Sequence, residues 1–492
     1  MKGYDNHTIE KIGIPAMVLM ERAALAVADE VCRGCNKSGS SQRKKYVYVL
    51  AGVGNNGGDG LAVARLLSER DFYVEVHCVG DESKASEQWK EQYAILQHYD
   101  VKLVDAPTRR DYDCLVDALF GVGLSREVEG VYREAIEKYN ALDGFKVAVD
   151  IPSGIHSDNG SVLGCAVKAD TTVTFGFCKR GLVLYPGCGY VGEVQIADIG
   201  ITERSFCGRE PEMFTYDEPV ADLVPERNPA GNKGTFGKIL LVAGSVNMAG
   251  AAILAAKAAY RSGAGMVKVI TPADNRVIVQ EMLPEALLGT EDDLEKSLEW
   301  ADVIVIGPGL GKTSVALENL RTVLAEGHKP LVIDADGLNL LAENPKLMEQ
   351  LSKTGATGRV IIMTPHVGEL ARLTGKSIAE CKADLTSVAL ALAKDIHAVI
   401  VAKDARSHVC AQGHPIYLNT SGNSGMATAG SGDVLAGICG ALLAQGMNGF
   451  EAATVAVYLH GKAGDMVAER LGEATCMAGD LIEEIGKAWK QE

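Results

Sequence analysis

The sequence predicts an α/β protein built from two domains, each with a mostly parallel sheet, and three observations support this prediction. Short apolar runs alternate with helical patterns along the chain, which is typical of doubly wound sheets. The 492 residues are too many for one ordinary domain. The periodic pattern fades between residues 202 and 233, where four prolines occur. We therefore expect one domain over residues 1–217 and another over residues 218–492.

The first domain is expected to open with a helix over residues 16–31, because its apolar residues recur with helical spacing. Strands are expected at residues 46–51, 73–79, 114–119, 146–151, 171–175 and 193–197. Helical patterns separate most of these runs, so a parallel sheet with helices on both faces is predicted. This is a Rossmann-like arrangement of three layers.

The second domain repeats the alternation with different spacing, so we expect another α/β fold and no internal repeat. Strands are expected at residues 238–243, 266–270, 301–306, 331–333, 360–363 and 398–402. An alanine-rich helix over residues 249–262 should be buried, and an apolar helix covers residues 434–443. Ligand sites in such sheets lie at the carboxyl ends of the strands. The loops that follow these strands should therefore converge with residues 430–433.

Composition excludes several classes of protein. The net charge of −16 argues against a nucleic-acid partner, which would need clustered Lys and Arg. No apolar run is long enough for a membrane span of about 18 residues, so no membrane association is expected. The apolar segment 12–27 contains Glu21 and Arg22, which argues against a secretion signal. Twelve scattered cysteines predict reduced thiols and a cytoplasmic protein, and Cys32 and Cys35 follow a helical pattern that does not suggest redox chemistry.

The most informative segment is Gly430-Ser-Gly-Asp433, at the start of the apolar helix. A glycine-rich helix start points several backbone N–H groups at one place, where an anion is bound. A carboxylate there repels an anion, so Asp433 is unsuited to simple anion binding. Its presence is explained if it takes a proton from a hydroxyl while the amides hold a transferring phosphoryl group. The segment therefore predicts phosphoryl-transfer chemistry.

A second glycine-rich loop follows the first strand of the chain. Gly52, Gly54 and Gly57 satisfy the dinucleotide-binding pattern, and Glu75 lies 18 residues beyond Gly57. Asn55, Asn56 and Asp59 add oxygen-bearing side chains, and Asp59 would repel a pyrophosphate unless a cation or a proton transfer is involved. The alternative is that Asn and Asp simply tolerate turn dihedrals.

Two further aspartates, Asp117 and Asp150, each end a strand of the first domain. Asn56, Asp117 and Ser153 offer hard oxygen ligands for one cation. Asp150 then remains available as a carboxylate acid or base. For both aspartates a helix N-cap is the structural alternative.

Three segments of the first domain together resemble the NAD(P)HX epimerase family, whose substrate is hydrated NADH or NADPH. They are AGVGNNGGDG (51–60), VDALFGVGL (116–124) and VAVDIPSGIHSDNG (147–160), and the resemblance extends over roughly residues 1–215. It implies interconversion of the R and S epimers at the hydrated ring carbon, with potassium bound by Asn56, Asp117 and Ser153. It also implies substrate contacts at Asn55, Asn56, Gly57, Gly58, Asp59, Gly121, Val122, Gly123, Leu124, Ser125, Arg126, Glu127 and Asp150. One departure is Cys178, which replaces the proline usual before Lys179.

Four segments of the second domain resemble the ADP-dependent NAD(P)HX dehydratase family, which is similar to ribokinase-fold kinases. They are NKGTFGKILLVAGSV (232–246), GPGLG (307–311), TPHVGE (364–369) and NSGMATAGSGDVLAG (423–437). The resemblance implies that ADP phosphorylates the hydrate's hydroxyl, with magnesium accompanying ADP, and that AMP and phosphate are released. Asp433 would activate the hydroxyl. Hydrate contacts are implied at Ala251, Gly309 and His366, and nucleotide contacts at Lys403, Asp404, Ala405, Arg406, Ser407 and Gly432.

Two residues depart from the dehydratase pattern, and several alternatives stay open. Val367 replaces a proline, and Asp404 replaces a glycine and should weaken ADP binding by its charge. Glu369 would either orient His366 or help bind magnesium. Asp334 and Asp336 are either site residues or strand-end caps. Lys403 and His366 each have a structural alternative, as a solvated lysine and a structural histidine.

The sequence therefore predicts a bifunctional repair enzyme that acts on NADHX or NADPHX and forms a homo-oligomer. Two alternatives differ in class. The first is an ATP-dependent kinase for a vitamin-like alcohol fused to a nucleotide-binding module, which would release a stable phosphorylated product. In the second, the first domain is a binding or assembly module without catalysis.

Overall fold

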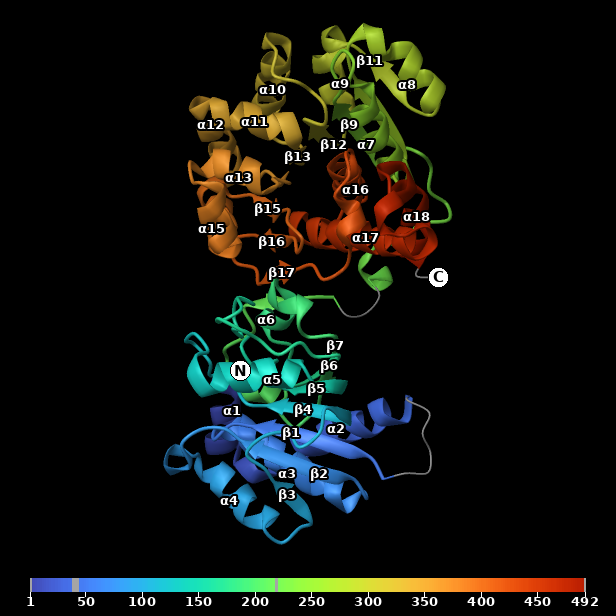
Figure 1. Cartoon of the computed structure of the whole chain (residues 1–492). Coiled ribbons are helices and arrows are strands. Elements are labelled where there is room, and N and C mark those ends of the chain that lie inside the picture. Colours follow the sequence, from blue (N-terminus) through green and yellow to red (C-terminus); the bar gives the residue numbers. More distant parts are fainter. Residues whose placement is uncertain (1, 38–43, 217–219, 491–492) are drawn as a thin grey trace. The chain divides into compact units, whose positions relative to one another are not determined.

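The computed structural model describes residues 2–37, 44–216 and 220–490 and divides into two compact units, residues 1–210 and 211–492 (Figure 1). The predicted boundary between residues 217 and 218 lies outside the described residues. Strand β8 (Met213–Phe214) pairs with β17 (Ile416–Leu418) in the sheet of the second unit. Residues just before the predicted boundary therefore belong to the second unit.

The first unit contains a seven-stranded sheet in which every pair of neighbours is parallel. Its order is β3-β2-β1-β4-β5-β6-β7, with bounds β1 (Tyr46–Ala51), β2 (Tyr73–Cys78), β3 (Val101–Leu103), β4 (Asp111–Ala118), β5 (Asp143–Val149), β6 (Thr171–Phe175) and β7 (Glu193–Ala197). The six predicted strands are present, with some ends moved by up to three residues. β3 was not predicted, since it has three residues and two of them are exposed.

Helices cover both faces of this sheet, as the prediction of three layers requires. They are α1 (Lys2–His7), α2 (Ala16–Lys37), α3 (Asn55–Glu69), α4 (Glu87–Leu96), α5 (Gly130–Asn140) and α6 (Arg180–Val183). Alternate residues of a strand point to opposite faces. Val47 and Val49 of β1 accordingly pack in one core with α2 and α3, whereas Tyr48 and Leu50 pack in another with α5.

The second unit contains a ten-stranded sheet in the order β11-β10-β9-β12-β13-β14-β15-β16-β17-β8. Its further strands are β9 (Lys238–Val242), β10 (Met266–Ile270), β11 (Leu287–Gly289), β12 (Val303–Ile306), β13 (Leu331–Ile333), β14 (Ile361–Met363), β15 (Val399–Ala402) and β16 (His408–Cys410). β16 is antiparallel to β15 and to β17, and the other pairs are parallel. The prediction missed β8, β11, β16 and β17, which have only two or three residues each.

Two helical layers enclose this sheet. One contains α7 (Ala249–Arg261), α16 (Ser431–Ala444), α17 (Gly449–Leu471) and α18 (Ala478–Lys490), which share a core with alternate strand residues. The other contains α9 (Leu294–Trp300), α10 (Ser314–Glu326), α11 (Ala335–Glu343), α12 (Pro345–Ala356), α13 (Val367–Thr374) and α15 (Leu385–Ile396). The shorter α8 (Arg276–Met282) and α14 (Ile378–Ala383) complete the unit. α7 packs against α16 and is largely buried, as predicted.

None of the helices in the described parts of the chain is both long and apolar enough to cross a membrane.

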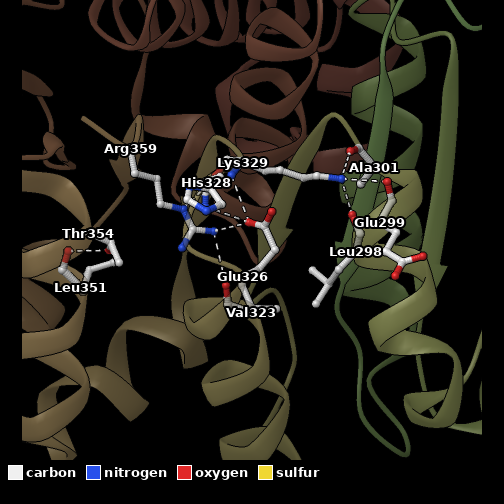
Figure 2. A network of polar contacts seen from close by, with 10 residues as sticks. All are labelled: Leu298, Glu299, Ala301, Val323, Glu326, His328, Lys329, Leu351, Thr354 and Arg359. Atoms are coloured by element: carbon white, nitrogen blue, oxygen red, sulfur yellow. Dashed lines mark hydrogen bonds and ion pairs between the residues drawn. The ribbon is translucent and has the colours of Figure 1, made fainter. Parts of the chain in front are cut away.

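A network of hydrogen bonds connects the amino ends of β13 and β14 to neighbouring helices (Figure 2). The Lys329 ammonium donates to the backbone carbonyls of Leu298, Glu299 and Ala301, where α9 ends. This position is favourable for a cation because helix carbonyls there lack partners. Arg359 donates to the Lys329 carbonyl at 2.8 Å and to the Glu326 carboxylate at 3.4 Å. This edge of the sheet is therefore occupied by contacts that hold the unit together, and the chemically interesting groups lie at the opposite, carboxyl edge.

Candidate active sites

The first candidate site is in the first unit, where β1 leads through Gly52 into α3. Neighbouring strands β1 and β4 lie at the centre of the sheet, where the strand order reverses and ligands bind. Gly57 is required for this turn, because a Cβ atom there would lie 1.8 Å from the Gly52 carbonyl oxygen. The turn places the N-terminus of α3, with Asn55 and Asn56, at the carboxyl edge of the sheet.

The three residues predicted to bind a cation are brought together around Phe120. The Asn56 amide donates to the Phe120 carbonyl at 3.0 Å, and the Phe120 N–H donates to the Ser153 hydroxyl oxygen at 2.8 Å. Asp117 is fully buried and accepts the Ser153 N–H at 2.7 Å and its hydroxyl at 2.6 Å. Burial raises the pKa of Asp117 to about 6. The cluster is thus a set of amide, hydroxyl, carbonyl and carboxylate oxygens at one place.

Asp150 lies at the end of β5 in a second cluster. Its backbone has φ 67°, a left-handed conformation that is uncommon for a residue other than glycine and that is often found at functional sites. Its Oδ1 accepts the Lys179 ammonium at 2.5 Å, the Thr174 hydroxyl at 3.2 Å and the Phe175 N–H at 3.3 Å. Asp150 is not a helix N-cap, because its carboxylate accepts hydrogen bonds from Lys179 and from two residues of β6.

Two more acidic side chains share this region. Burial, reinforced by the nearby carboxylates of Asp150 and Asp5, raises the pKa of Asp59 well above its ordinary value. Burial also raises the pKa of Asp5, against the lowering effect of Lys179. Asp59 was predicted as a substrate contact. Asp5 was not predicted, because α1 has only six residues and no amphipathic pattern marks it.

The loop after β4 meets this site only in part. A Cβ atom on Gly121 would lie 3.2 Å from Asn56, so the start of the loop packs against α3. Ser125, Arg126 and Glu127 are exposed, and the Glu127 carboxylate lies beside Gly164. Val122, Gly123 and Leu124 are the other residues of this loop that were predicted to contact the substrate.

Glu75, the acidic residue of the dinucleotide pattern, is engaged within the protein. Its carboxylate accepts the Tyr112 hydroxyl at 2.7 Å and also contacts Thr108 and Lys102. The Glu75 carboxylate is therefore not free to bind a ribose. The prediction of a simple dinucleotide-binding site does not hold at this residue.

The second candidate site is in the second unit, at the N-terminus of α16. Gly430 precedes the helix in a left-handed conformation with φ 89°, and Ser431, Gly432 and Asp433 form its first turn. Asp433 is partly buried. Burial and the carboxylate of Asp334 raise its pKa to about 7, while Lys403 opposes the shift. The carboxylate thus lies at the amide-rich helix start, as the sequence predicted, and it changes charge near neutral pH.

Lys403 approaches the same turn from the end of β15. A Cβ atom on Gly432 would lie 3.1 Å from the Lys403 ammonium and 3.7 Å from the Asp334 carboxylate, so glycine leaves this space open. The ammonium donates to Asp334 Oδ1 at 2.9 Å, and the same oxygen accepts the Thr364 hydroxyl at 2.6 Å. Burial alone would lower the pKa of Lys403, but Asp334 and Glu369 raise it. Asp334 is thus a site residue with no side-chain capping bond, and Lys403 is not a solvated surface lysine.

His366 begins α13 as its N-cap, beside Lys403. Its Nδ1 accepts the Gly368 N–H at 3.0 Å, while Glu369 accepts the His366 backbone N–H at 2.9 Å and lies 3.4 Å from Nε2. Burial and the nearby Lys403 and Arg372 lower the pKa of His366, so the imidazole is neutral at pH 7. These two contacts favour the prediction that Glu369 orients His366. Val367 occupies the first helical position, which does not require proline.

The remaining predicted residues lie around this centre. A Cβ atom on Gly309 would lie 2.7 Å from the Ala251 side chain, so these two predicted hydrate contacts are neighbours. Asp336 accepts the Gly311 N–H at 2.8 Å and so orders that loop. Residues 403–407 form the turn between β15 and β16, in which Asp404 and Ala405 are exposed, whereas Arg406 and Ser407 are partly buried.

Sequence reasoning missed one contact of the α16 turn. The Ser431 hydroxyl lies 3.3 Å from Nε2 of the buried His460 of α17. Burial lowers the pKa of His460 to about 4, so this imidazole is neutral. The pair ties the first residue of the helix to α17, and no local motif marks His460.

Metal-binding side chains and cysteines are two further features of the described chain. Over residues 2–37, 44–216 and 220–490, no group of three or more His, Cys, Asp or Glu side chains is arranged to hold a metal ion. None of the twelve cysteines, Cys32 and Cys35 included, forms a disulfide.

Comparison with known families agrees with the two resemblances. Residues 239–487 match the family described as NAD(P)H-hydrate dehydratase, and residues 16–181 match the family described as YjeF-related protein N-terminus. A bifunctional NAD(P)H-hydrate repair enzyme from Thermofilum pendens is 38% identical over 510 residues, which cover 99% of this chain and 94% of that protein. The enzyme of the same name from Escherichia coli is 34% identical and covers 98% of this chain and 91% of its own length.

A solved structure supports the fold of the second unit. A ribokinase-like superfamily protein from Enterococcus faecalis is 29% identical, with a TM-score of 0.51, and covers 57% of this chain and 96% of its own. The full-length similarity to the two repair enzymes does not support the alternative of a vitamin kinase fused to a nucleotide-binding module.

Proposed function

Because the chain belongs to the bifunctional NAD(P)H-hydrate repair enzymes, acting as epimerase and dehydratase, we propose that Asp150 and Asp433 are its two catalytic carboxylates. Epimerisation is assigned to the unit that contains Asp150, and dehydration to the unit that contains Asp433. The second assignment follows the match of residues 239–487 to the dehydratase family.

Epimerisation requires a bond at the hydrated carbon to break and then to re-form on the other face. That carbon carries the added hydroxyl beside the ring nitrogen. We assign Asp150 to take the hydroxyl proton, and Asp59 to protonate the ring nitrogen as the carbon–nitrogen bond opens. Reversal of both transfers closes the ring with either configuration. The environments support this division, because the pKa of Asp59 is raised, as suits an acid, while Asp150 contacts an ammonium, as suits a base.

The oxygen cluster around Phe120 fits a potassium ion. Asn56, Asp117 and Ser153 would hold it, with carboxylate, amide and hydroxyl oxygens of the kind that hard cations prefer. A bound cation would offset the charge of the fully buried Asp117 and attract the substrate's pyrophosphate. Asn55, Gly57, Gly58 and the loop over residues 121–127 would line the substrate.

Dehydration needs a better leaving group than hydroxide. We assign Asp433 to take the hydroxyl proton while ADP transfers its terminal phosphoryl group to that oxygen, which releases AMP. Phosphate then leaves together with a ring proton, and NAD(P)H is restored. The amides around Gly432 and the Lys403 ammonium would stabilise the transferring group, as an anion hole does.

The hydrate and the nucleotide would meet at Asp433. Ala251, Gly309 and His366 would contact the hydrate, and residues 403–407 would lie along ADP. Magnesium would accompany ADP, held mainly by its phosphates and by water, as is usual for this ion. We also infer a homo-oligomer, from resemblance to the family, and a cytoplasmic location, from the twelve scattered cysteines.

One observation carries the dehydratase assignment: Asp433 lies in the first turn of α16, with the Lys403 ammonium against the same turn. The test is incubation with mixed epimers of NADHX and of NADPHX, with ADP or ATP, while the absorbance of the reduced nicotinamide is followed. Complete recovery with release of one phosphate is expected. A stable phosphorylated product without recovery would contradict the proposal.

A further inference from the structure

We propose that Lys179 is the positioning residue of the epimerase site, which fixes one carboxylate oxygen of Asp150 so that the other is presented to the substrate. This inference rests on the proposed catalytic role of Asp150. It adds a residue that the resemblance to the epimerase family did not assign, because Lys179 entered there only as the residue after Cys178.

The first argument is the asymmetry of the contacts at Asp150. Three donors reach its carboxylate, from Thr174, Phe175 and Lys179, and all three bond to Oδ1. Within the described ranges of the chain, no hydrogen bond or ion pair is made to Oδ2. A carboxylate with one oxygen saturated and the other open has a fixed orientation, and its second oxygen is available to accept a proton.

The second argument is that Lys179 has no donor left for a ligand. An ammonium has three N–H donors and no acceptor. They are used on Asp150 Oδ1 at 2.5 Å, the Thr174 hydroxyl oxygen at 2.9 Å and the Phe175 carbonyl at 2.9 Å. The side chain is also only 5% exposed. Lys179 therefore acts through Asp150, and binding of the substrate's phosphates is not its role.

The third argument is electrostatic. Asp5, Asp59 and Asp150 are close enough to affect one another's ionisation, and Lys179 lies among them. A buried carboxylate without a partner takes up a proton, because burial penalises its charged form. Lys179 thus places a positive charge directly against Asp150, in a region where burial raises the pKa of the neighbouring Asp5 and Asp59 carboxyls. A base and an acid can then coexist within one small site.

The test compares three variants of the full-length protein on the pure R epimer, with the uncatalysed rate subtracted. Lys179→Met keeps the length of the side chain and removes its charge, and should lower kcat for epimerisation by about 100-fold with little change in KM. Lys179→Ala should lose activity similarly, and ethylamine added to the assay should restore part of it by supplying an ammonium to the vacated space. Lys168→Met, at an exposed lysine of the same unit, is the matched control and should keep the wild-type rate.

Dehydration of the pure S epimer by the same preparations should be unchanged and reports that the second unit is intact, whereas recovery of epimerisation with ethylamine reports that the first unit is folded. A Lys179→Met enzyme with the wild-type kcat would overturn the inference, as would a Lys179→Ala enzyme whose lost rate ethylamine does not restore. A wild-type protein that fails to epimerise would instead contradict the proposed function itself, so the two failures are distinguishable.

Discussion

Each candidate site has a carboxylate at the carboxyl edge of its own mostly parallel sheet, but the two carboxylates are paired differently with the nearest lysine. In the first unit the Lys179 ammonium contacts Asp150 directly, at 2.5 Å. In the second unit the Lys403 ammonium contacts Asp334 at 2.9 Å, and Asp433 lies beyond that pair. The position of one ammonium therefore distinguishes a carboxylate held in an ion pair from one that titrates near pH 7.

This difference matches what the two reactions need. Epimerisation must run equally in both directions, so it requires a base and an acid together, the roles proposed for Asp150 and Asp59. Phosphoryl transfer requires a carboxylate able to take a proton beside groups that hold an anion. Asp433, with a pKa of about 7 at an amide-rich helix start, has that property.

The largest expected effect separates the two sites completely. Asp433→Asn should lower dehydration of the S epimer by about 100-fold to 10,000-fold, because the amide cannot accept the proton. Epimerisation should be unchanged. Asp150→Asn should do the reverse. Rates on the separated epimers check both variants, and a single substitution that abolishes both reactions would contradict independent sites.

The next effect concerns pH and the lysine of the second site. Because Asp433 must be deprotonated to act as a base, kcat/KM for dehydration should fall about tenfold per pH unit below about 7. Lys403 lowers the pKa of Asp433, so Lys403→Met should move this limb to higher pH. The measurement is kcat/KM, which reports the free enzyme, from pH 5.5 to 9. A limb that stays in place in Lys403→Met would show that Asp433 does not set it.

A smaller effect is expected for potassium. Ser153→Ala removes a hydroxyl that bonds to the buried Asp117, and should weaken potassium activation of epimerisation by about tenfold. Titration with potassium chloride at constant ionic strength, with tetramethylammonium as the replacement cation, measures it. Ser161→Ala is a suitable control, since that hydroxyl donates to the Asn159 side chain at 2.8 Å and neither residue is proposed to bind the cation or the substrate. If potassium has no effect on epimerisation by the wild-type protein, the proposed cation site is contradicted.

The smallest effect is expected at Asp404. Its exposed carboxylate follows Lys403 in the turn proposed to lie along ADP. Asp404→Gly should tighten ADP binding about threefold at low salt, since exposed charge interactions contribute only about 0.2–1 kcal/mol, and the gain should shrink as salt rises. Equilibrium binding of ADP at two salt concentrations tests this expectation. Unchanged affinity at low salt would mean that ADP lies elsewhere or that Asp404 points away from it.

The sequence predicted the longer strands and the motif-bearing loops because both leave local patterns. Strands inside the sheet give continuous apolar runs even where they have only three residues, as β13 and β14 do. The missed strands β8, β11, β16 and β17 are equally short but lie at the two ends of the strand order, and no motif-bearing loop marks them. Asp117, Ser153 and Asn56 were correctly grouped, since strands of a parallel sheet end at one edge. Their role as cation ligands remains a prediction.

Other features depended on the tertiary fold and left no local signal. Asp5 reaches the first site from a helix of six residues, and His460 reaches α16 from the middle of a buried helix. Lys179 had a usable signal, because it lies four residues beyond the end of β6 at the ligand-binding edge. Glu75 shows the opposite error, since its spacing suggested ribose binding while Tyr112 and Thr108 occupy its carboxylate.

The most direct test of the central claim, that two separate carboxylates carry the two reactions, is complementation between inactive variants. Pure R epimer and ADP are given to Asp150→Asn protein, to Asp433→Asn protein, and to an equal mixture of the two. Each variant alone should restore almost no reduced nicotinamide beyond the uncatalysed background, and the mixture should restore nearly all of it. Recovery by either variant alone, or a mixture as inactive as its components, would contradict the account.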